Sequence, residues 1–295
     1  MGISQSLATQ HPTPITHHPS PITHHPTPIT PMTTYQHLTK STQAKVCRIT
    51  LNRPDVHNAF NAQLIQDLRA AFEEVRVEAE AGEVRAVVLG GEGKSFCAGA
   101  DVNWMRDNLE YSVEENRADA RRMAEMFDAI DSCPVPVIAR IHGAALGGGV
   151  GLASVCDIVI ATRETAWAFS EVKLGIAPAV ISPFVLAKIG RSHARALFLT
   201  GERFSAERAM QIGLAHVVVE ADGLDAEVER VLKEIVGSSP RGIRRAKELV
   251  AQVPNLSPDQ ARDVTVATIA ALRTSPEGQD GLRAFLERRK PGWAE

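Results

Sequence analysis

The amino-acid sequence predicts an α/β fold that is followed by a helical layer. Between residues 44 and 162, short apolar segments typical of strands alternate with segments whose apolar residues recur at helical spacing. From about residue 182 onward, the apolar spacing and the cap residues are those of helices. We therefore expect a tail over residues 1–31, a core over residues 32–220 and a C-terminal helical region over residues 221–295.

Composition and charge narrow the class of protein. The chain has 295 residues, 44% of them hydrophobic and 23% charged, which suits a globular protein with a large core. A net charge of -3 and a pI near 6.4 argue against nucleic-acid binding. No apolar run is long enough to cross a membrane. The four cysteines are far apart and form no CxxC pair, so we expect reduced thiols, no metal site and a cytoplasmic protein.

The first 31 residues differ from the rest. The heptad from His11 to His17, HPTPITH, recurs with one Thr-to-Ser change from His18 to His24. Proline occupies two positions in each unit and blocks helix and ladder bonding, which predicts polyproline II or disorder. We expect a tail without function, with weak metal binding by its histidines as the alternative. A start of translation at Met32 is a further possibility for this segment.

The core is predicted as buried or alternating strands and amphipathic helices. The strands are expected over residues 44–51, 85–89, 135–141 and 157–162, and the helices over residues 61–79 and 112–131. Ser112 and Glu115 form a capping box that begins the second helix. Residues 52–55 are expected to form a turn.

The C-terminal region carries its own helix signals. Ser205 is expected to cap a helix that stops at Gly213. Residues 257–260 combine a capping box with proline at the first helical position. Ser275 and the proline after it begin a last helix, which is expected to run through Arg289.

A glycine stretch, residues 147–151, lies between a predicted strand and a short apolar segment. This order predicts a strand, a tight turn and a helix, and the first amides of a helix can hold an anion. A close helix–strand contact is the alternative explanation of the glycines. Residues 95–101 and residues 170–175 favour a site, because an oxyanion held by two amides near a carboxylate is a catalytic arrangement.

Several motifs, taken in this order, resemble the crotonase, or enoyl-CoA hydratase/isomerase, superfamily. They are residues 51–54 with 58–59, residues 95–101, residues 143–151, residues 156–157, residues 170–175 and residues 285–291. The resemblance implies a spiral of ββα units with C-terminal helices that pack between subunits. It also implies a homotrimer or homohexamer and an acyl-CoA substrate, with coenzyme A as part of the substrate and no separate cofactor.

The resemblance also implies the catalytic groups. The thioester oxygen would lie between the backbone amides of Ala100 and Gly148, which stabilise the charge of an enolate. Glu171 matches one of the two glutamates that hydratases of the family commonly use. The other glutamate would stand at position 151, where this chain has glycine, so the two-carboxylate mechanism is in doubt.

Substrate-binding residues follow from the same motifs. They are expected to be Val56, His57, Ala59, Ala98, Ala100, Asp101, Val102, Trp104, Gly148, Phe285 and Lys290. By resemblance, Trp104 borders the acyl group, with core packing as the alternative. Phe285 and Lys290 or Arg288 would reach the coenzyme A of a neighbouring subunit.

A subgroup is indicated by residues 99–105, 149–152 and 170–183, which look like those of bacterial methylglutaconyl-CoA and isohexenylglutaconyl-CoA hydratases. These enzymes act in leucine and acyclic terpene breakdown. We therefore expect a hydratase that acts on 3-methylglutaconyl-CoA or a related thioester. An enoyl-CoA isomerase that uses one glutamate, and a non-catalytic acyl-CoA- or RNA-binding homologue, are the alternatives.

Overall fold

The computed structural model describes Met1 and residues 34–294. The predicted proline-rich tail therefore lies outside the described residues, Met1 apart. The strands are β1 (Leu38–Gln43), β2 (Val46–Leu51), β3 (Ala86–Gly91), β4 (Val137–Ile141), β5 (Ala144–Leu146), β6 (Ile158–Thr162), β7 (Ala166–Ala168), β8 (Arg203–Phe204) and β9 (Val217–Val219). The α-helices are α1 (Ala62–Glu80), α2 (Val102–Asn108), α3 (Val113–Asp131), α4 (Gly148–Val155), α5 (Ser182–Thr200), α6 (Ala206–Gln211), α7 (Leu224–Gly237), α8 (Pro240–Gln252), α9 (Pro258–Thr274) and α10 (Pro276–Glu287).

A six-stranded sheet organises the core, in the order β1-β2-β3-β4-β6-β9. β1 pairs antiparallel with β2, whereas the pairs from β2 to β9 are parallel. Parallel neighbours need crossover segments between them, and α1 and α3 supply these for β2 to β3 and for β3 to β4. The alternation of strands and helices that the sequence indicated is therefore that of a parallel sheet.

Successive residues of the central strands face opposite sides of this sheet, as the two-residue period of a strand requires. Val87 and Leu89 belong to the larger hydrophobic cluster, which also contains the buried faces of α1, α3 and α4. Ala86 and Val88 belong to a second cluster with the apolar face of α7. Helices thus cover both faces of the sheet.

The first strand was predicted to begin too early. Ala44 and Lys45 have φ of 49° and 63° and form the turn of a hairpin, so β2 begins at Val46. β1 was not predicted, because LTKSTQ contains one apolar residue and shows no clear alternation. Pairing with β2 gives this segment its strand conformation.

The long helices α1 and α3 lie where the sequence predicted them. The side chain of Asn61 accepts a hydrogen bond from Leu64 N at the start of α1, at 2.8 Å. The capping box of Ser112 and Glu115 is present at the start of α3, which ends at Asp131 as expected. Both predictions are confirmed.

A small sheet in the order β5-β7-β8 supports the glycine turn. The predicted strand over residues 135–141 is β4, but the unpredicted β5 lies between it and the turn at Gly147, and α4 begins at Gly148, within the glycine stretch rather than after it. β5 and β7, three residues each, were not predicted separately. Such short strands carry too few residues for a periodic signal.

The C-terminal part is mainly helical, as predicted, although β8 and β9 interrupt it. The predicted capping box at Ser257 is present, and Ser275 caps α10. α10 ends at Glu287 rather than Arg289, because Arg288 adopts the left-handed conformation with φ of 55°.

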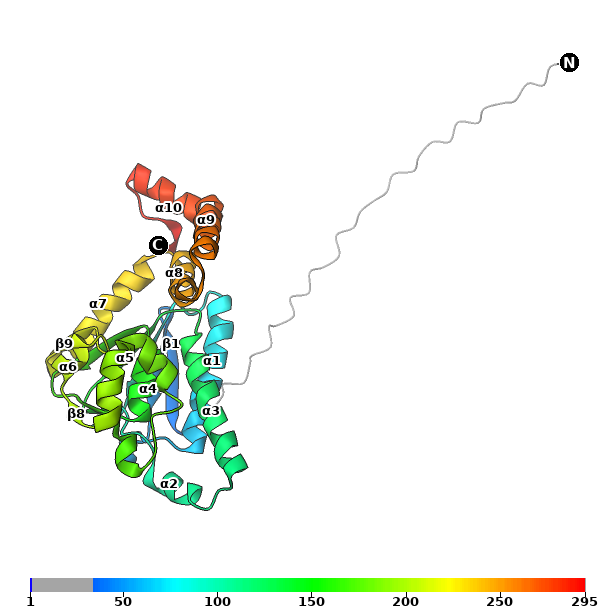
Figure 1. The fold of residues 1–295 in the computed structure, drawn as a ribbon. Helices are drawn as coiled ribbons and strands as arrows, with labels where there is room; N and C mark the ends of the chain where they lie inside the picture. Colours follow the sequence, from blue (N-terminus) through cyan, green and yellow to red (C-terminus); the bar gives the residue numbers. More distant parts are fainter. Residues whose placement is uncertain (2–33, 295) are drawn as a thin grey trace. The chain divides into compact units, whose positions relative to one another are not determined.

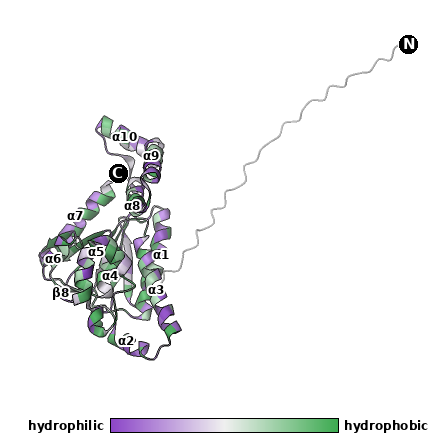
Figure 2. Ribbon diagram, in the orientation of Figure 1, coloured by the Kyte–Doolittle hydropathy of each residue, from purple (hydrophilic) through white to green (hydrophobic). Residues whose placement is uncertain are grey.

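In Figure 1, α9 and α10 lie at one end of the folded chain, and α2 lies at the opposite end. Figure 2 shows hydrophobic residues in α4 and also on α10. None of the described helices combines the length and the apolar character that crossing a bilayer requires.

Candidate active site

The glycine turn presents an amide at the start of α4. Gly147 has φ of 49° and ψ of -117°, a conformation that side chains disfavour, and its N–H donates to Ala168 O at 2.8 Å. Gly148 is the first residue of the eight-residue helix α4, where a backbone N–H has no partner within the helix. In the described part of the chain, this amide meets no acceptor. It is therefore available to an anion.

A second amide is available at Ala100. Phe60 forms a parallel bridge with it, in which Phe60 N donates to Gly99 O at 2.7 Å and Asp101 N donates to Phe60 O at 2.9 Å. In a parallel bridge the central residue turns its own N–H away from the partner strand. Ala100 is exposed, and its N–H has no acceptor among residues 34–294.

Main-chain hydrogen bonds join the two segments that carry these amides. Cys97 and Ala145 form a parallel bridge, in which Cys97 N donates to Ala144 O and Leu146 N donates to Cys97 O, both at 3.0 Å. Ala100 and Gly148 each lie three residues beyond this bridge, so the parallel segments carry both amides to corresponding positions. The geometry fits an oxyanion hole.

Glu171 lies beside this turn, in the 3-10 helix Ser170–Leu174. A Cβ atom on Gly147 would stand 3.2 Å from Oε1 of Glu171, which shows how closely the carboxylate approaches the glycine. Oε2 is buried and has no hydrogen-bond partner among the described residues. Burial raises the pKa of Glu171 above its usual range, which suits a group that takes up and returns a proton.

The position of the missing glutamate is occupied by apolar groups. A Cβ atom on Gly151 would stand 2.4 Å from Cγ2 of Ile181 and 2.9 Å from Cζ of Phe127. No longer side chain fits there without movement of both neighbours. The site therefore has one nearby carboxylate at the turn, that of Glu171.

His57, one of the predicted substrate-binding residues, lies against the oxyanion segment. His57 O accepts a hydrogen bond from Ala98 N at 3.0 Å, and the ring of His57 contacts Ser95 Oγ through Nδ1 at 3.1 Å. His57 is exposed, as is Val56, whereas Ala59 is buried. The structure thus brings the segment around His57 next to Ala98, as the sequence suggested.

Asp101 has a structural function that the sequence did not indicate. Its Oδ1 accepts from Asn103 N at 2.8 Å and caps α2, and its Oδ2 accepts from Arg53 Nη2 at 2.8 Å. Burial works against ionisation of Asp101, but the hydrogen bonds and the charge of Arg53 prevail and lower its pKa. Arg53, which was expected only to form a turn, also donates to Ala59 O and so joins the two segments.

Other predicted residues are dispersed. Val102 and Trp104 lie on α2, immediately after Ala100. Phe285 is 82% exposed on α10, and Lys290 follows that helix. In Figure 1, α10, the helix of Phe285, lies at the opposite end of the folded chain from α2, the helix of Val102 and Trp104.

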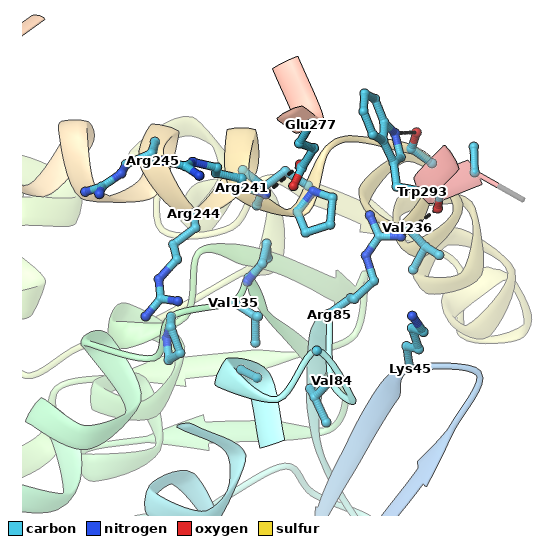
Figure 3. Close-up of a pocket in the computed structure, with 18 of the residues that line it drawn as sticks. Lys45, Val84, Arg85, Val135, Val236, Arg241, Arg244, Arg245, Glu277 and Trp293 are labelled. Carbon is cyan, nitrogen blue, oxygen red and sulfur yellow. Dashed lines mark hydrogen bonds between the residues drawn. The ribbon is translucent and has the colours of Figure 1, made fainter. Parts of the chain in front are cut away.

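A separate groove of about 1070 Å³ lies between the core and the N-terminal part of α8. Figure 3 shows it with several cationic side chains, and it contains none of the predicted site residues. Its cations are Lys45, Arg85, Lys233, Arg241, Arg244 and Arg245. Arg85 donates to the carbonyl oxygens of Ser238 and Trp293, which ties the start of β3 to the C-terminal region.

Comparisons with known proteins identify the family and the fold. The family model described as enoyl-CoA hydratase/isomerase matches residues 41–295. The short-chain-enoyl-CoA hydratase of Clostridium acetobutylicum is 31% identical over 84% of this chain and 94% of that protein. The structure of AtuE from Pseudomonas aeruginosa has a TM-score of 0.85 and 34% identity, and covers 88% of this chain and 100% of its own. An enoyl-CoA hydratase structure from Mycobacterium smegmatis has a TM-score of 0.83 and 33% identity, with the same coverage of both chains. The predicted crotonase-like α/β fold with a C-terminal helical region is confirmed.

Proposed function

This chain belongs to the enoyl-CoA hydratase/isomerase family, and on that premise we propose that it hydrates a branched glutaconyl thioester such as 3-methylglutaconyl-CoA. Water adds across the 2,3 double bond of the acyl group. The observation that carries this proposal is the half-buried Glu171 carboxylate beside the glycine turn, together with the available amides of Gly148 and Ala100.

The chemistry follows from these groups. The amides of Ala100 and Gly148 hold the thioester oxygen and stabilise the negative charge that develops on it. Glu171 takes a proton from water as the hydroxyl oxygen bonds to C3, and the electrons of the double bond pass to the thioester oxygen. Glu171 then returns the proton to C2 of the enolate, which restores the thioester.

The apolar filling around Gly151 supports a mechanism with a single carboxylate. A glutaconyl substrate carries its own distal carboxylate, which helps to place the water that a second glutamate would otherwise hold. The same single carboxylate also suits an isomerase, which moves a proton between C2 and C4 of a 3-enoyl-CoA. Isomerisation is therefore the second candidate function.

Turnover of a substrate panel tests the proposal. The purified protein is incubated with 3-methylglutaconyl-CoA, crotonyl-CoA and a 3-enoyl-CoA, and products are identified by mass. We expect addition of one water to 3-methylglutaconyl-CoA, with much slower hydration of crotonyl-CoA. Conversion of the 3-enoyl thioester without any hydration would favour the isomerase. Binding of all thioesters without turnover would indicate a non-catalytic homologue.

We also propose that the chain assembles as a homotrimer or homohexamer in the cytoplasm. Exposed apolar side chains on the C-terminal helices support assembly, because such surfaces favour association. They include Val250, Val266, Ile269, Leu282, Phe285 and Leu286. In the assembly, Phe285 and Lys290 would approach the coenzyme A of a neighbouring subunit. Light scattering that gives a monomeric mass for the active protein would contradict this arrangement.

A further inference from the structure

Two polar atoms on the inner face of α2 lack hydrogen-bond partners. Trp104 Nε1 and Asn108 Oδ1 are both buried, and within residues 34–294 neither meets a donor or acceptor. The two residues are four apart, so their side chains lie one above the other on the same face of the helix. The remaining α2 positions are exposed, except Met105.

Such a pair is unusual, since buried polar groups in native proteins nearly always have partners. A lone unpartnered indole would carry little weight. Trp167 Nε1 is also unpartnered, but Trp167 is fully buried in the core and its ring stacks on Phe204. Trp104 differs because it is only partly buried and shares its face with a second unpartnered group.

The pair lies next to the oxyanion segment. Ala100 directly precedes Asp101, the N-cap of α2, and Trp104 packs against the core cluster that contains Phe127 and Ile181. Trp104 is the third residue of α2 and follows Ala100 by four positions in the sequence. Side chains of a helix lean toward its N-terminus, which here is the Ala100 end.

We propose that Trp104 and Asn108 bind an oxygen atom at the distal end of the substrate's acyl group. This inference rests on the proposed function, because it places the thioester oxygen at the amide of Ala100. An extended chain of four C–C bonds, from C1 to C5, spans about 5 Å, which matches one turn of α2. A five-carbon acyl group therefore has the length to extend from the Ala100 amide along the first turn of α2, where Trp104 lies.

The chemistry of the pair defines the group that it binds. The indole N–H is a donor only, so the ligand atom must accept a hydrogen bond. The carboxamide of Asn108 presents either its oxygen or its nitrogen after rotation of its terminal bond, and the nitrogen gives a second donor. Both side chains are neutral. The distal oxygen is therefore hydrogen-bonded rather than ion-paired, and an acyl group with a hydrocarbon end leaves both donors unpaired.

Equilibrium binding of saturated thioesters tests this proposal apart from catalysis. Calorimetry compares glutaryl-CoA, its distal methyl ester and pentanoyl-CoA, which have acyl chains of equal length. We expect glutaryl-CoA, whose distal carboxylate is a charged acceptor, to bind roughly ten- to a hundredfold more tightly than pentanoyl-CoA, which has no distal acceptor. The methyl ester, whose distal carbonyl is a neutral acceptor, should have an affinity between the two. Trp104→Phe and Asn108→Leu should each reduce this preference about tenfold or more and leave pentanoyl-CoA affinity nearly unchanged.

Trp167→Phe is the matched control. It removes another buried, unpartnered indole N–H, so it should not change the preference for glutaryl-CoA, while the smaller ring leaves a cavity in the core and should lower thermal stability. An equal loss of affinity for glutaryl-CoA and pentanoyl-CoA in Trp104→Phe would show that Trp104 only packs, and would overturn the proposal. Equal affinities in the unaltered protein would overturn it too. Failure of the proposed hydration would instead appear as absent turnover, whatever the affinities are.

Discussion

Replacement of Glu171 by glutamine should change activity and stability in opposite directions. The amide keeps the shape of the side chain but neither accepts the proton from water nor returns it. We expect turnover to fall roughly 100- to 10,000-fold, the usual contribution of a positioned acid–base group. Affinity for a saturated acyl-CoA should remain, because the two amides of the oxyanion hole are unchanged.

The stability of the variant follows from the environment of the carboxylate. Burial raises the folded-state pKa of Glu171 above its value in the unfolded chain, so ionisation destabilises the folded state. This penalty is absent below the unfolded pKa and becomes complete above the folded pKa. Near pH 7, Glu171→Gln should therefore increase the free energy of unfolding, by about 1 kcal/mol for a half-buried group with one unpartnered oxygen.

Urea unfolding at about pH 7 and about pH 4 measures this effect, with the gain expected only at the higher pH. Glu164→Gln is a suitable control, because it removes the same charge from an exposed position nearby in sequence. The control should change neither turnover nor stability appreciably. A variant of Glu171 that is less stable at neutral pH, or that retains turnover, would refute the reasoning.

Three further predictions concern the same site. The reaction needs the ionised form of Glu171, and burial raises its pKa. As the pH is lowered, kcat/KM should therefore fall with a midpoint above the usual pKa range of glutamate. A midpoint within that range would contradict this prediction. Gly151→Glu should lower the free energy of unfolding by about 1–3 kcal/mol or more, since even its Cβ would stand 2.4 Å from Ile181. The same variant should not raise turnover. Thermal melts check the stability, and the hydration assay checks the turnover. Gly148→Pro removes an oxyanion donor and should reduce turnover roughly 100-fold or more, in protein that circular dichroism and coenzyme A binding show to be folded. Near-normal turnover would remove Gly148 from the site.

The fold was predicted best where the signal is local. Ser112 and Ser257 determine helix starts through hydrogen bonds to residues three positions ahead, so the sequence alone reveals them. β1 and β5 depend on partners distant in the sequence, and their own residues carry little strand pattern. The hairpin turn at residues 44–45 uses two non-glycine residues with positive φ, which no local rule favours.

The site was predicted unevenly for a similar reason. Ala100, Gly148 and Glu171 lie in segments whose motifs identify them one by one. The filling of the space beside Gly151 by Ile181 was not predictable, because it depends on a contact between α4 and the start of α5. The pairing of Arg53 with Asp101 likewise joins segments 48 residues apart. Such contacts require the folded chain.

The bridge between Cys97 and Ala145 joins, through main-chain atoms, the two segments that carry the proposed oxyanion donors Ala100 and Gly148. A Cβ atom on Gly149 would stand 2.3 Å from Cys97 O, so the two backbones touch directly there. Substitutions at positions whose side chains point away from this contact leave the donor spacing unchanged, whereas they alter the groups that surround the acyl chain. In the proposed function, the scaffold thus separates charge stabilisation, which the backbone would supply, from the choice of reaction and substrate, which exchangeable side chains would supply. A new acyl preference can therefore arise on this chain without rebuilding its anion-binding centre.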